Sequence, residues 1–249
     1  MQNDFISIIT PSYNSSRFIA QTIESVLSQT YENWEMIIVD DLSPDNSNEI
    51  IEEYVLRDSR IKLIKLEKNS GPAVARNRAI EEASGRYIAF LDADDLWMID
   101  KLQKQIDFMK AYNYELTYTA YETMSEDGVN LHHTVILPKK LNYNELLKAN
   151  RIGCLSAIYD SKRIGKVYMP LIQKRQDYGL WLRVLKKVDY AYGMDEVLGR
   201  YRIMSNSVSS NKLDLLKYNY RLFKEHEDFS TLKSLYYLSW NIYIKIMKK

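Results

Sequence analysis

Cysteine is nearly absent from this sequence, and neither sign of charge is in excess. Cys154 is the only cysteine in 249 residues, so the chain cannot form an internal disulfide, and this usage is typical of a reducing compartment. Lys plus Arg number 34 and Asp plus Glu number 33, which leaves a net charge of +1. A domain that binds nucleic acid typically carries a basic face. The charge balance indicates no such face, and we expect no nucleic-acid partner.

The sequence also lacks the usual features of secretion and membrane insertion. Asp4 stands near the N-terminus and no basic region precedes the short apolar run, so we expect no signal peptide. No segment contains the roughly 20 consecutive apolar residues that span a bilayer. A hydrophobic content of 46% is ample for a folded core. We therefore expect a folded, cytoplasmic protein.

Strand-like and helix-like segments alternate through the first hundred residues. Apolar runs at 5–10, 34–39, 61–66 and 87–91 predict strands, with helices between them at 17–28, 47–57 and 73–83. This alternation with short connections predicts a Rossmann-like, mostly parallel α/β sheet with helices on both faces. Ligands of such sheets bind at the carboxyl ends of the strands. The polar segments that follow these strands are therefore expected to meet at one edge.

The second half has a mixed pattern. The expected elements are a helix at 100–112, a hairpin at 116–123 and 129–137, a helix at 143–149, a strand near 155–159, a helix at 176–187 and a strand at 197–203. No low-complexity linker separates the two halves. We therefore expect one continuous sheet that serves two lobes.

Three carboxylates follow directly on the expected strand at 87–91. Asp92, Asp94 and Asp95 fall within four positions, without a Lys or Arg among residues 91–98. Like charges about 4 Å apart repel by about 4 kcal/mol near a protein surface, so such a cluster needs a cation or a raised pKa. Carboxylate oxygens suit Mg²⁺ or Mn²⁺ that also holds phosphates. Alternatively, Asp94 or Asp95 caps the next helix and the other carboxylates are solvated.

The last residues, 213–249, are expected to form a helical tail. Its final segment, 232–249, combines several Tyr, Trp and Lys residues, which are typical of helices that lie at a membrane interface. We expect this segment to dock on a membrane surface without crossing it. The alternative is an ordinary amphipathic helix packed on its own domain.

Several motifs occur in an order that characterises a known family. They are Pro11-Ser12-Tyr13-Asn14, Val39-Asp40-Asp41-Leu42-Ser43, Arg76-Asn77, Leu91-Asp92-Ala93-Asp94-Asp95 and Gln176-Asp177-Tyr178-Gly179-Leu180-Trp181-Leu182. Together they closely resemble the inverting family 2 glycosyltransferases, of the bacterial surface-polysaccharide type. The likeness is most specific over the first hundred residues and extends to about residue 210.

This resemblance implies the GT-A fold and a division of labour along the chain. Residues 1–212 would form the glycosyltransferase domain, with nucleotide-sugar and metal binding in 1–97. Residues 98–212 would supply the acceptor lobe and the catalytic base. The tail at 213–249 has no family signature.

The resemblance also implies a donor-binding set. Pro11 and Tyr13 would pack against the nucleotide base, and Asp41 would accept a hydrogen bond from a ring N–H. Arg76 would approach the diphosphate beside Asp92-Ala93. On residue type alone, Asp41 also suits a turn with the serine two residues later. Arg76 likewise suits a solvated or ion-paired helix position.

A metal site is implied at the same strand end. Asp94, with Asp92 assisting, would hold Mn²⁺ or Mg²⁺ that bridges the two phosphates and acts as a Lewis acid for the leaving nucleoside diphosphate. Many relatives place a His after the Tyr-Arg segment, where it can approach the metal. This sequence has Met204 there, a poor ligand for a hard cation. Ser205, Asn206 or Ser207 would instead contact phosphate, or water would complete the coordination of the metal.

The family's catalytic base corresponds to Asp177. An inverting transfer needs one carboxylate to take the proton from the acceptor hydroxyl as its oxygen attacks the anomeric carbon. A position in a helix's first turn favours the ionised form. The family often has Glu before the base, whereas this sequence has Gln176, which adds no charge. Without the resemblance, the sequence alone would favour a helix cap for Asp177.

Three functions are compatible with these residues. The resemblance implies transfer of a sugar from a nucleotide sugar, with UDP expected, to a saccharide acceptor such as a lipid-linked intermediate of O-antigen, capsule or another surface polysaccharide. A nucleotidyltransferase would instead be expected to have a Gly-rich phosphate loop, and residues 11–16 contain no Gly. A non-catalytic nucleotide- or sugar-binding module has no need for Asp92, Asp94 and Asp177 together.

Overall fold

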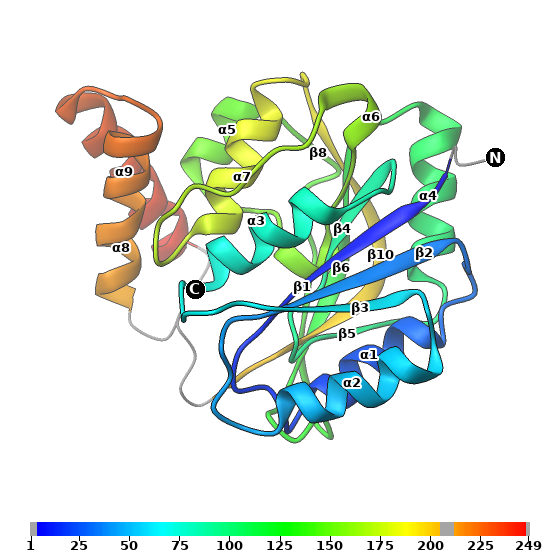
Figure 1. Cartoon of the computed structure of the whole chain (residues 1–249). Coiled ribbons are helices and arrows are strands. Elements are labelled where there is room, and N and C mark those ends of the chain that lie inside the picture. The colour runs from blue at the N-terminus through cyan, green and yellow to red at the C-terminus, as the bar shows by residue number, and fades with distance from the viewer. Residues whose placement is uncertain (1–3, 205–211, 248–249) are drawn as a thin grey trace.

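The computed structural model describes residues 4–204 and 212–247, and one ten-stranded sheet runs through both halves of this part of the chain (Figure 1). The strand order is β3-β2-β1-β4-β9-β6-β10-β5, while β7 pairs with β6 and β8 pairs with β10. The strands are β1 (Ile6–Ser12), β2 (Trp34–Asp40), β3 (Ile61–Lys65), β4 (Tyr87–Phe90), β5 (Leu96–Trp97), β6 (Leu116–Met124), β7 (Leu131–Val135), β8 (Lys140–Leu141), β9 (Ile158–Asp160) and β10 (Ala191–Arg202). The expected continuous sheet is confirmed.

Helices cover both faces of the sheet, as predicted. Helices α1 (Ile19–Leu27), α2 (Ser47–Arg57) and α4 (Lys101–Tyr112) contribute to one buried apolar cluster. Helices α3 (Pro72–Glu82), α5 (Tyr143–Lys148), α6 (Ser161–Ile164) and α7 (Gln176–Leu185) contribute to a second cluster. Ile8 belongs to the first cluster and Ile9 to the second. Because successive side chains of a strand point to opposite faces, the two clusters lie on opposite sides of the sheet.

The four strands predicted in the first hundred residues form the parallel part of the sheet. β2 pairs with both β3 and β1, and β1 pairs with β4, all in parallel. Every residue of β2 is buried, which explains why it is mostly apolar. Its one interior charge, Glu35, is paired with Lys62 and accepts a hydrogen bond from the hydroxyl of Ser7. The carboxyl ends of β1, β2 and β4 therefore meet at one edge, and the polar segments that follow them are brought together.

β1 is longer than the pattern indicated, because it continues through Pro11 to Ser12. Pro11 lies opposite Val39 of β2, whereas the pairing of β1 with β4 ends at Ile9. In a parallel strand, alternate residues direct their N–H and C=O groups to alternate neighbours. The carbonyl of Ile9 accepts the N–H of Leu91, on the side of β4. Pro11 is two residues further along β1, so its backbone nitrogen faces the same side, where β4 has already ended and no hydrogen bond is lost. Proline is tolerated at such a position.

The chain from residue 96 onward contains short elements that the sequence did not predict. β5 and β8 have two residues each and α6 has four, which is too short to show a periodic pattern. β10 begins at Ala191 rather than near residue 197, and its register against β6 shifts on both sides of Val197. β9 runs antiparallel between β4 and β6, so it joins the parallel part to the mixed part.

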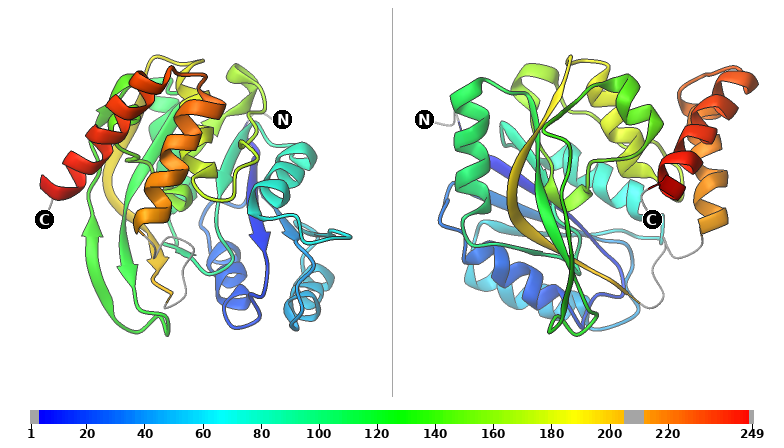
Figure 2. Two further views of the ribbon diagram at one scale, coloured as in Figure 1. Left: turned by 90° about the vertical axis from the view of Figure 1, so that its left-hand side faces the viewer. Right: turned by 180° about the vertical axis from the view of Figure 1, so that it is seen from behind.

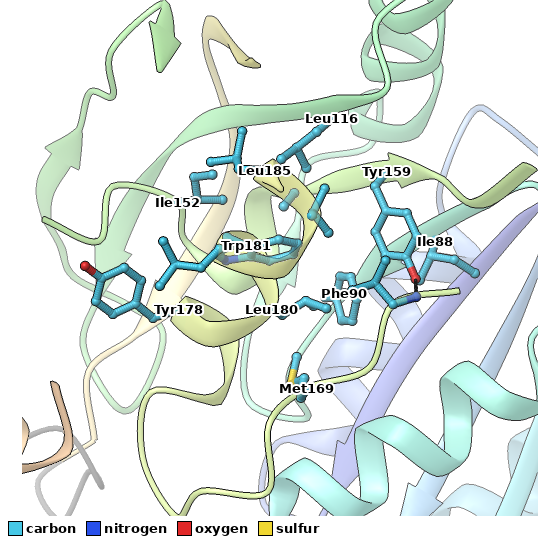
Figure 3. Close-up of a cluster of buried hydrophobic side chains, with 14 of the residues drawn as sticks. Ile88, Phe90, Leu116, Ile152, Tyr159, Met169, Tyr178, Leu180, Trp181 and Leu185 are labelled. Carbon is cyan, nitrogen blue, oxygen red and sulfur yellow. Dashed lines mark hydrogen bonds between the residues drawn. The ribbon is translucent and has the colours of Figure 1, made fainter. Parts of the chain in front are cut away.

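A buried aromatic cluster holds α7 against the sheet (Figure 3). The rings of Trp181 and Phe90 meet edge to face with centroids 5.4 Å apart, and Phe90 also stacks on Tyr159. Such pairs stabilise a core beyond their buried area by about 0.5–1.5 kcal/mol each. The position of Asp177, in the first turn of α7, is thereby tied to the end of β4.

The C-terminal helices pack on the second lobe. They are α8 (Lys212–Arg221), a π-helical turn η2 (Leu222–His226) and α9 (Thr231–Met247), and Figure 2 shows α8 and α9 side by side at one edge of the molecule. Asn241 is buried in this interface, where its side-chain amide donates to the carbonyls of Leu147 and Lys148. No helix in the described part of the chain is both long and apolar enough to cross a bilayer.

Candidate active site

A cavity of about 1180 Å³ lies at the carboxyl ends of β1, β2 and β4. It extends from these strand ends to the start of α7 and to the C-terminal helices. Every site residue expected from the sequence lines it, namely Pro11, Tyr13, Asp41, Arg76, Asp92, Ala93, Asp94 and Asp177. Residues that lie far apart in the chain therefore share one site.

Asp40 and Asp41, at the end of β2, have separate structural tasks. Asp40 accepts hydrogen bonds from the backbone N–H and the hydroxyl of Ser43, so Asp40, and not Asp41, forms the turn. Asp41 accepts the backbone N–H groups of Ser70 and Gly71, both at 2.7 Å. Because each carboxylate oxygen has a second lone pair, Asp41 can still accept a hydrogen bond from a ligand in the cavity.

The aromatic ring expected to contact the base is available at this end. Tyr13 is 54% exposed, and Pro11 is half-buried at the end of β1. The backbone of Asn14 is left-handed at φ 51°, and its N–H donates to the hydroxyl of Ser43. This contact links the segment after β1 to the turn after β2. Residues 11–15 and Asp41 line this end of the cavity.

Arg76 is buried and forms an ion pair with Asp92. Its guanidinium donates to Oδ1 of Asp92 at 2.5 Å, so the ion-paired alternative for Arg76 is confirmed, with a partner from the acidic cluster. Although burial opposes its charge, Asp92 raises the pKa of Arg76, which stays protonated. Its buried Nε has no acceptor in the described part of the chain. A buried N–H without an acceptor is costly, so an anion beside it would be stabilised.

Asp94 has the properties expected of a cation ligand. Burial and the neighbouring Asp92 raise the pKa of Asp94 to about 6. Its side chain accepts no hydrogen bond from another residue of the described chain. A divalent cation beside this carboxylate would favour the ionised form and relieve its repulsion with Asp92.

Asp95, unlike Asp94, is fully buried and forms a hydrogen bond within the protein. Its Oδ1 accepts the backbone N–H of Arg202 at the end of β10. Burial, with Asp94 and Asp92 nearby, raises the pKa of Asp95 well above its ordinary value. The cap of α4 is Asp100, and its side chain forms no capping bond. The alternative in which Asp94 or Asp95 caps this helix is therefore wrong.

The acidic pair fits Mg²⁺ or Mn²⁺ only together with other ligands. Residues 4–204 and 212–247 contain no group of three or more His, Cys, Asp or Glu placed to hold a metal. Asp94 and Asp92 would supply two carboxylates, and Mg²⁺ is commonly bound by one or two carboxylates plus substrate phosphates and water. Met204 lines the cavity, whereas Ser205, Asn206 and Ser207 lie outside the described residues.

Arg202 is a site residue to which the sequence assigned no role. Its buried guanidinium donates to the carbonyls of Asp94 and Glu126 and to the side chain of Gln21. It also lies over the ring of Phe18. Arg202 therefore fixes the backbone at Asp94 against α1 and the β6–β7 turn. The only feature of the sequence that could have indicated this residue is the Tyr201-Arg202 pair, which belongs to the resemblance to the family.

Asp177 lies in the first turn of α7 and lines the cavity from the second half of the chain. Arg175 occupies the N-cap position of α7, and its side chain forms no capping hydrogen bond. The Asp177 carboxylate accepts a hydrogen bond from the side-chain amide of Asn150 at 3.2 Å. The structure therefore does not support the helix-cap alternative for Asp177. Asn150, on the loop after α5, was missed because a single polar loop residue carries no pattern. Gln176 is buried and donates to the carbonyl of Gln173.

Solved structures with this architecture define the fold class. Staphylococcus aureus TarS 1–349 in complex with UDP-GlcNAc superposes with a TM-score of 0.74 at 20% identity, covering 94% of this chain and 70% of that one. The mannosyltransferase PcManGT from Pyrobaculum calidifontis, in complex with GDP-Man and Mn²⁺, gives 0.68 at 16% identity, with 94% and 69% covered. The chain therefore has the GT-A fold, as expected.

Sequence comparisons then identify the family. The model for glycosyl transferase family 2 matches residues 7–161. The putative teichuronic acid biosynthesis glycosyltransferase TuaG of Bacillus subtilis is 45% identical over 92% of this chain and 91% of its own length. The UDP-Glc:alpha-D-GlcNAc-diphosphoundecaprenol beta-1,3-glucosyltransferase WfgD of Escherichia coli is 39% identical over 100% and 96%. The chain belongs to glycosyl transferase family 2.

Proposed function

We propose that this glycosyltransferase transfers a sugar from a UDP-sugar, with inversion, to a lipid-linked saccharide used for a bacterial surface polysaccharide. One observation carries the proposal. A single cavity joins the donor-type residues Asp41, Arg76 and Asp94 to Asp177 on the opposite lobe. The names of TuaG and WfgD, which refer to teichuronic acid and to a diphosphoundecaprenol-linked acceptor, support this class of acceptor.

The donor would bind along the strand ends. Tyr13 and Pro11 would contact the base, Asp41 would accept its ring N–H, and Arg76 would bind the diphosphate, because its buried Nε lacks an acceptor. Asp94 and Asp92 would hold Mn²⁺ or Mg²⁺, and the bound metal would stabilise charge on the leaving diphosphate. The complexes of TarS with UDP-GlcNAc and of PcManGT with GDP-Man and Mn²⁺ support a nucleotide-sugar donor and a metal.

The reaction requires a base on the acceptor side. The acceptor oxygen would attack the anomeric carbon as the bond to the diphosphate breaks, and UDP would leave with the electron pair. Asp177 would take the proton of the attacking hydroxyl. Asn150 would hold the carboxylate in place through its hydrogen bond to Oδ2. Asn150 is a positioning residue in this scheme.

Ligand-dependent melting tests this proposal against nucleotidyl transfer. UDP with Mn²⁺ is expected to raise the melting temperature, because a ligand that binds only the folded state stabilises it, whereas ATP or GTP with Mn²⁺ is expected to have no such effect.

A screen of nucleotide sugars against membrane lipid extract, followed by mass spectrometry, would then identify the donor. Stabilisation by ATP alone, or no mass increase of a single sugar with any donor, would contradict the proposal.

We further propose that α9 rests on the inner face of the cell membrane. Thr231–Met247 contains no acidic residue, and one face packs on the protein through Ser234 and Asn241. Its other face exposes a row of large apolar side chains at helical spacing, namely Leu232, Leu235, Tyr236, Ile242, Tyr243, Ile246 and Met247. Exposed Lys233 and Lys245 would interact with anionic headgroups. This arrangement is typical of a helix lying in an interface.

Liposome flotation tests the membrane proposal. The protein is expected to float with anionic liposomes, and Tyr236→Glu/Tyr243→Glu is expected to abolish flotation because both side chains are about half exposed. Deletion of α9 is unsuitable, since Asn241 is part of the core packing. Leu56→Glu, at an 88% exposed site on α2, is the matched control and should float normally. Equal flotation of all three proteins, or of none, would show that α9 has only a structural role.

A further inference from the structure

Two arginines on the acceptor side of the cavity have side chains that are not bonded to the described part of the chain. Arg151 and Arg175 both line the cavity, and neither guanidinium forms a hydrogen bond or ion pair in residues 4–204 and 212–247. The Nε of Arg175 is buried without an acceptor. By contrast, Arg76 and Arg202, which line the same cavity, are bonded to the protein. A half-buried guanidinium without an acceptor is costly, so an anionic ligand would relieve this cost.

The backbone at Arg175 is held in an unfavourable conformation. Its φ of 70° and ψ of 23° are left-handed, a region that residues other than Gly, Asn and Asp rarely adopt. The flanking residues hold it there, because Lys174 pairs with Asp214 of α8 and Gln176 donates to the carbonyl of Gln173. Such strain often accompanies a functional position. The left-handed conformation of Arg175 turns the chain into α7, and the Arg175 side chain lines the cavity at this point.

Both arginines are close in sequence to the proposed base or to the residue that binds it. They are distant in sequence from the donor-type residues Asp41, Arg76 and Asp94. Arg175 is two residues before Asp177, and Arg151 follows Asn150, which binds Asp177. The end of α5, three residues before Arg151, contacts α9 through Asn241, and the segment before Arg175 contacts α8 through a hydrogen bond from Tyr218 to Gln173. Residues of α8 and α9 line the same cavity. The arginines therefore belong to segments that contact both the proposed base and the C-terminal helices.

We infer that Arg151 and Arg175 bind the diphosphate of the lipid-linked acceptor. This inference rests on the proposed function, because it needs an acceptor sugar joined to a lipid through phosphates. Guanidinium groups bind phosphate through paired, charge-assisted hydrogen bonds. With the diphosphate held there, the attached sugar lies beside Asp177 and the lipid extends toward α9. The donor diphosphate has its own cation in Arg76.

Direct binding of two acceptor probes tests the inference. The probes are GlcNAc joined to a hexyl chain through a diphosphate and GlcNAc joined to hexyl directly. Each is titrated calorimetrically into protein saturated with UDP and Mn²⁺, so that the donor phosphate site is already filled. Wild type is expected to bind the diphosphate probe at least about tenfold more tightly, a difference of about 1.4 kcal/mol.

Variants then locate the preference. Arg151→Gln/Arg175→Gln is expected to bind both probes equally while its UDP affinity stays within about twofold of wild type. Arg151→Lys/Arg175→Lys should recover part of the preference, because charge remains and the paired geometry is lost. Arg57→Gln, on α2 outside the cavity, should retain all of it. Melting temperatures show that each variant is folded, and the Lys variant serves if the Gln variant is not.

Three results would overturn the inference. They are equal binding of the two probes by wild type, an unchanged preference in the folded Gln or Lys variant, and a loss of UDP affinity that matches the loss of probe affinity. The last result would assign the arginines to the donor. Failure of the proposed function is detected separately, as absence of sugar transfer by wild type, because the binding measurement needs no turnover.

Discussion

Asp177→Asn is expected to slow sugar transfer at least about a hundredfold while the protein remains folded and binds UDP. An amide cannot accept a proton at neutral pH, and loss of a general base typically costs about a hundredfold to ten-thousandfold in rate. The fold should tolerate the change, because the amide oxygen can still accept the hydrogen bond from Asn150. Loss of one charge near a helix N-terminus costs about 0.3–1 kcal/mol.

Single-turnover transfer at saturating donor measures this effect without product release. Asp195→Asn, an exposed position on β10 outside the cavity, is the matched control and should transfer at the wild-type rate. Asp177→Ala is less informative, because it also removes the partner of Asn150. Near-normal turnover by folded Asp177→Asn would mean that another group takes the proton.

Asp94→Asn is expected to remove the metal dependence of UDP binding. The carboxylate of Asp94 is the one in the acidic cluster that accepts no hydrogen bond from another described residue, and its pKa is raised to about 6 by burial and by Asp92. If a divalent cation joins this carboxylate to the diphosphate, EDTA should weaken UDP binding to wild type at least about tenfold. The variant should bind UDP weakly with or without metal.

Calorimetry of UDP binding with Mn²⁺, Mg²⁺ or EDTA provides the measurement. Asp107→Asn, at an exposed site on α4, is the control and should keep the wild-type metal dependence. UDP binding of equal strength in EDTA and in Mn²⁺ would exclude a bridging metal. Loss of binding together with a lowered melting temperature would instead indicate damage to the loop that Arg202 holds.

The predicted donor residues share the cavity because local patterns determined their positions. β1, β2 and β4 are apolar and end in polar segments, and parallel strands bring those ends to one edge. The pattern could not separate the tasks of neighbouring carboxylates. Asp40 forms the turn that residue type also allowed for Asp41, and Asp95 binds the end of β10 while Asp94 remains available.

The part of the cavity around Asp177 was much less predictable. Asn150, Arg151 and Arg175 lie in loops, where the sequence has no periodic pattern. They become candidate site residues only because Asn150 binds Asp177 and all three line the same cavity. Arg202 is distant in sequence from Asp94, Glu126 and Gln21, all of which accept its hydrogen bonds. Such contacts depend on the packing of whole elements, which a single sequence does not encode locally.

The sequence by itself therefore determined the parallel α/β core, its helices on both faces and the chemistry at its strand ends, because side-chain periodicity and strand-end residues are local properties. Only the tertiary structure decided how the mixed half completes the sheet, which carboxylates remain available to a ligand, and how α7 places Asp177 across the cavity. It also decided that α9 packs through Asn241 and exposes an apolar face. These outcomes depend on which buried groups find partners, and those partners lie far away in the chain.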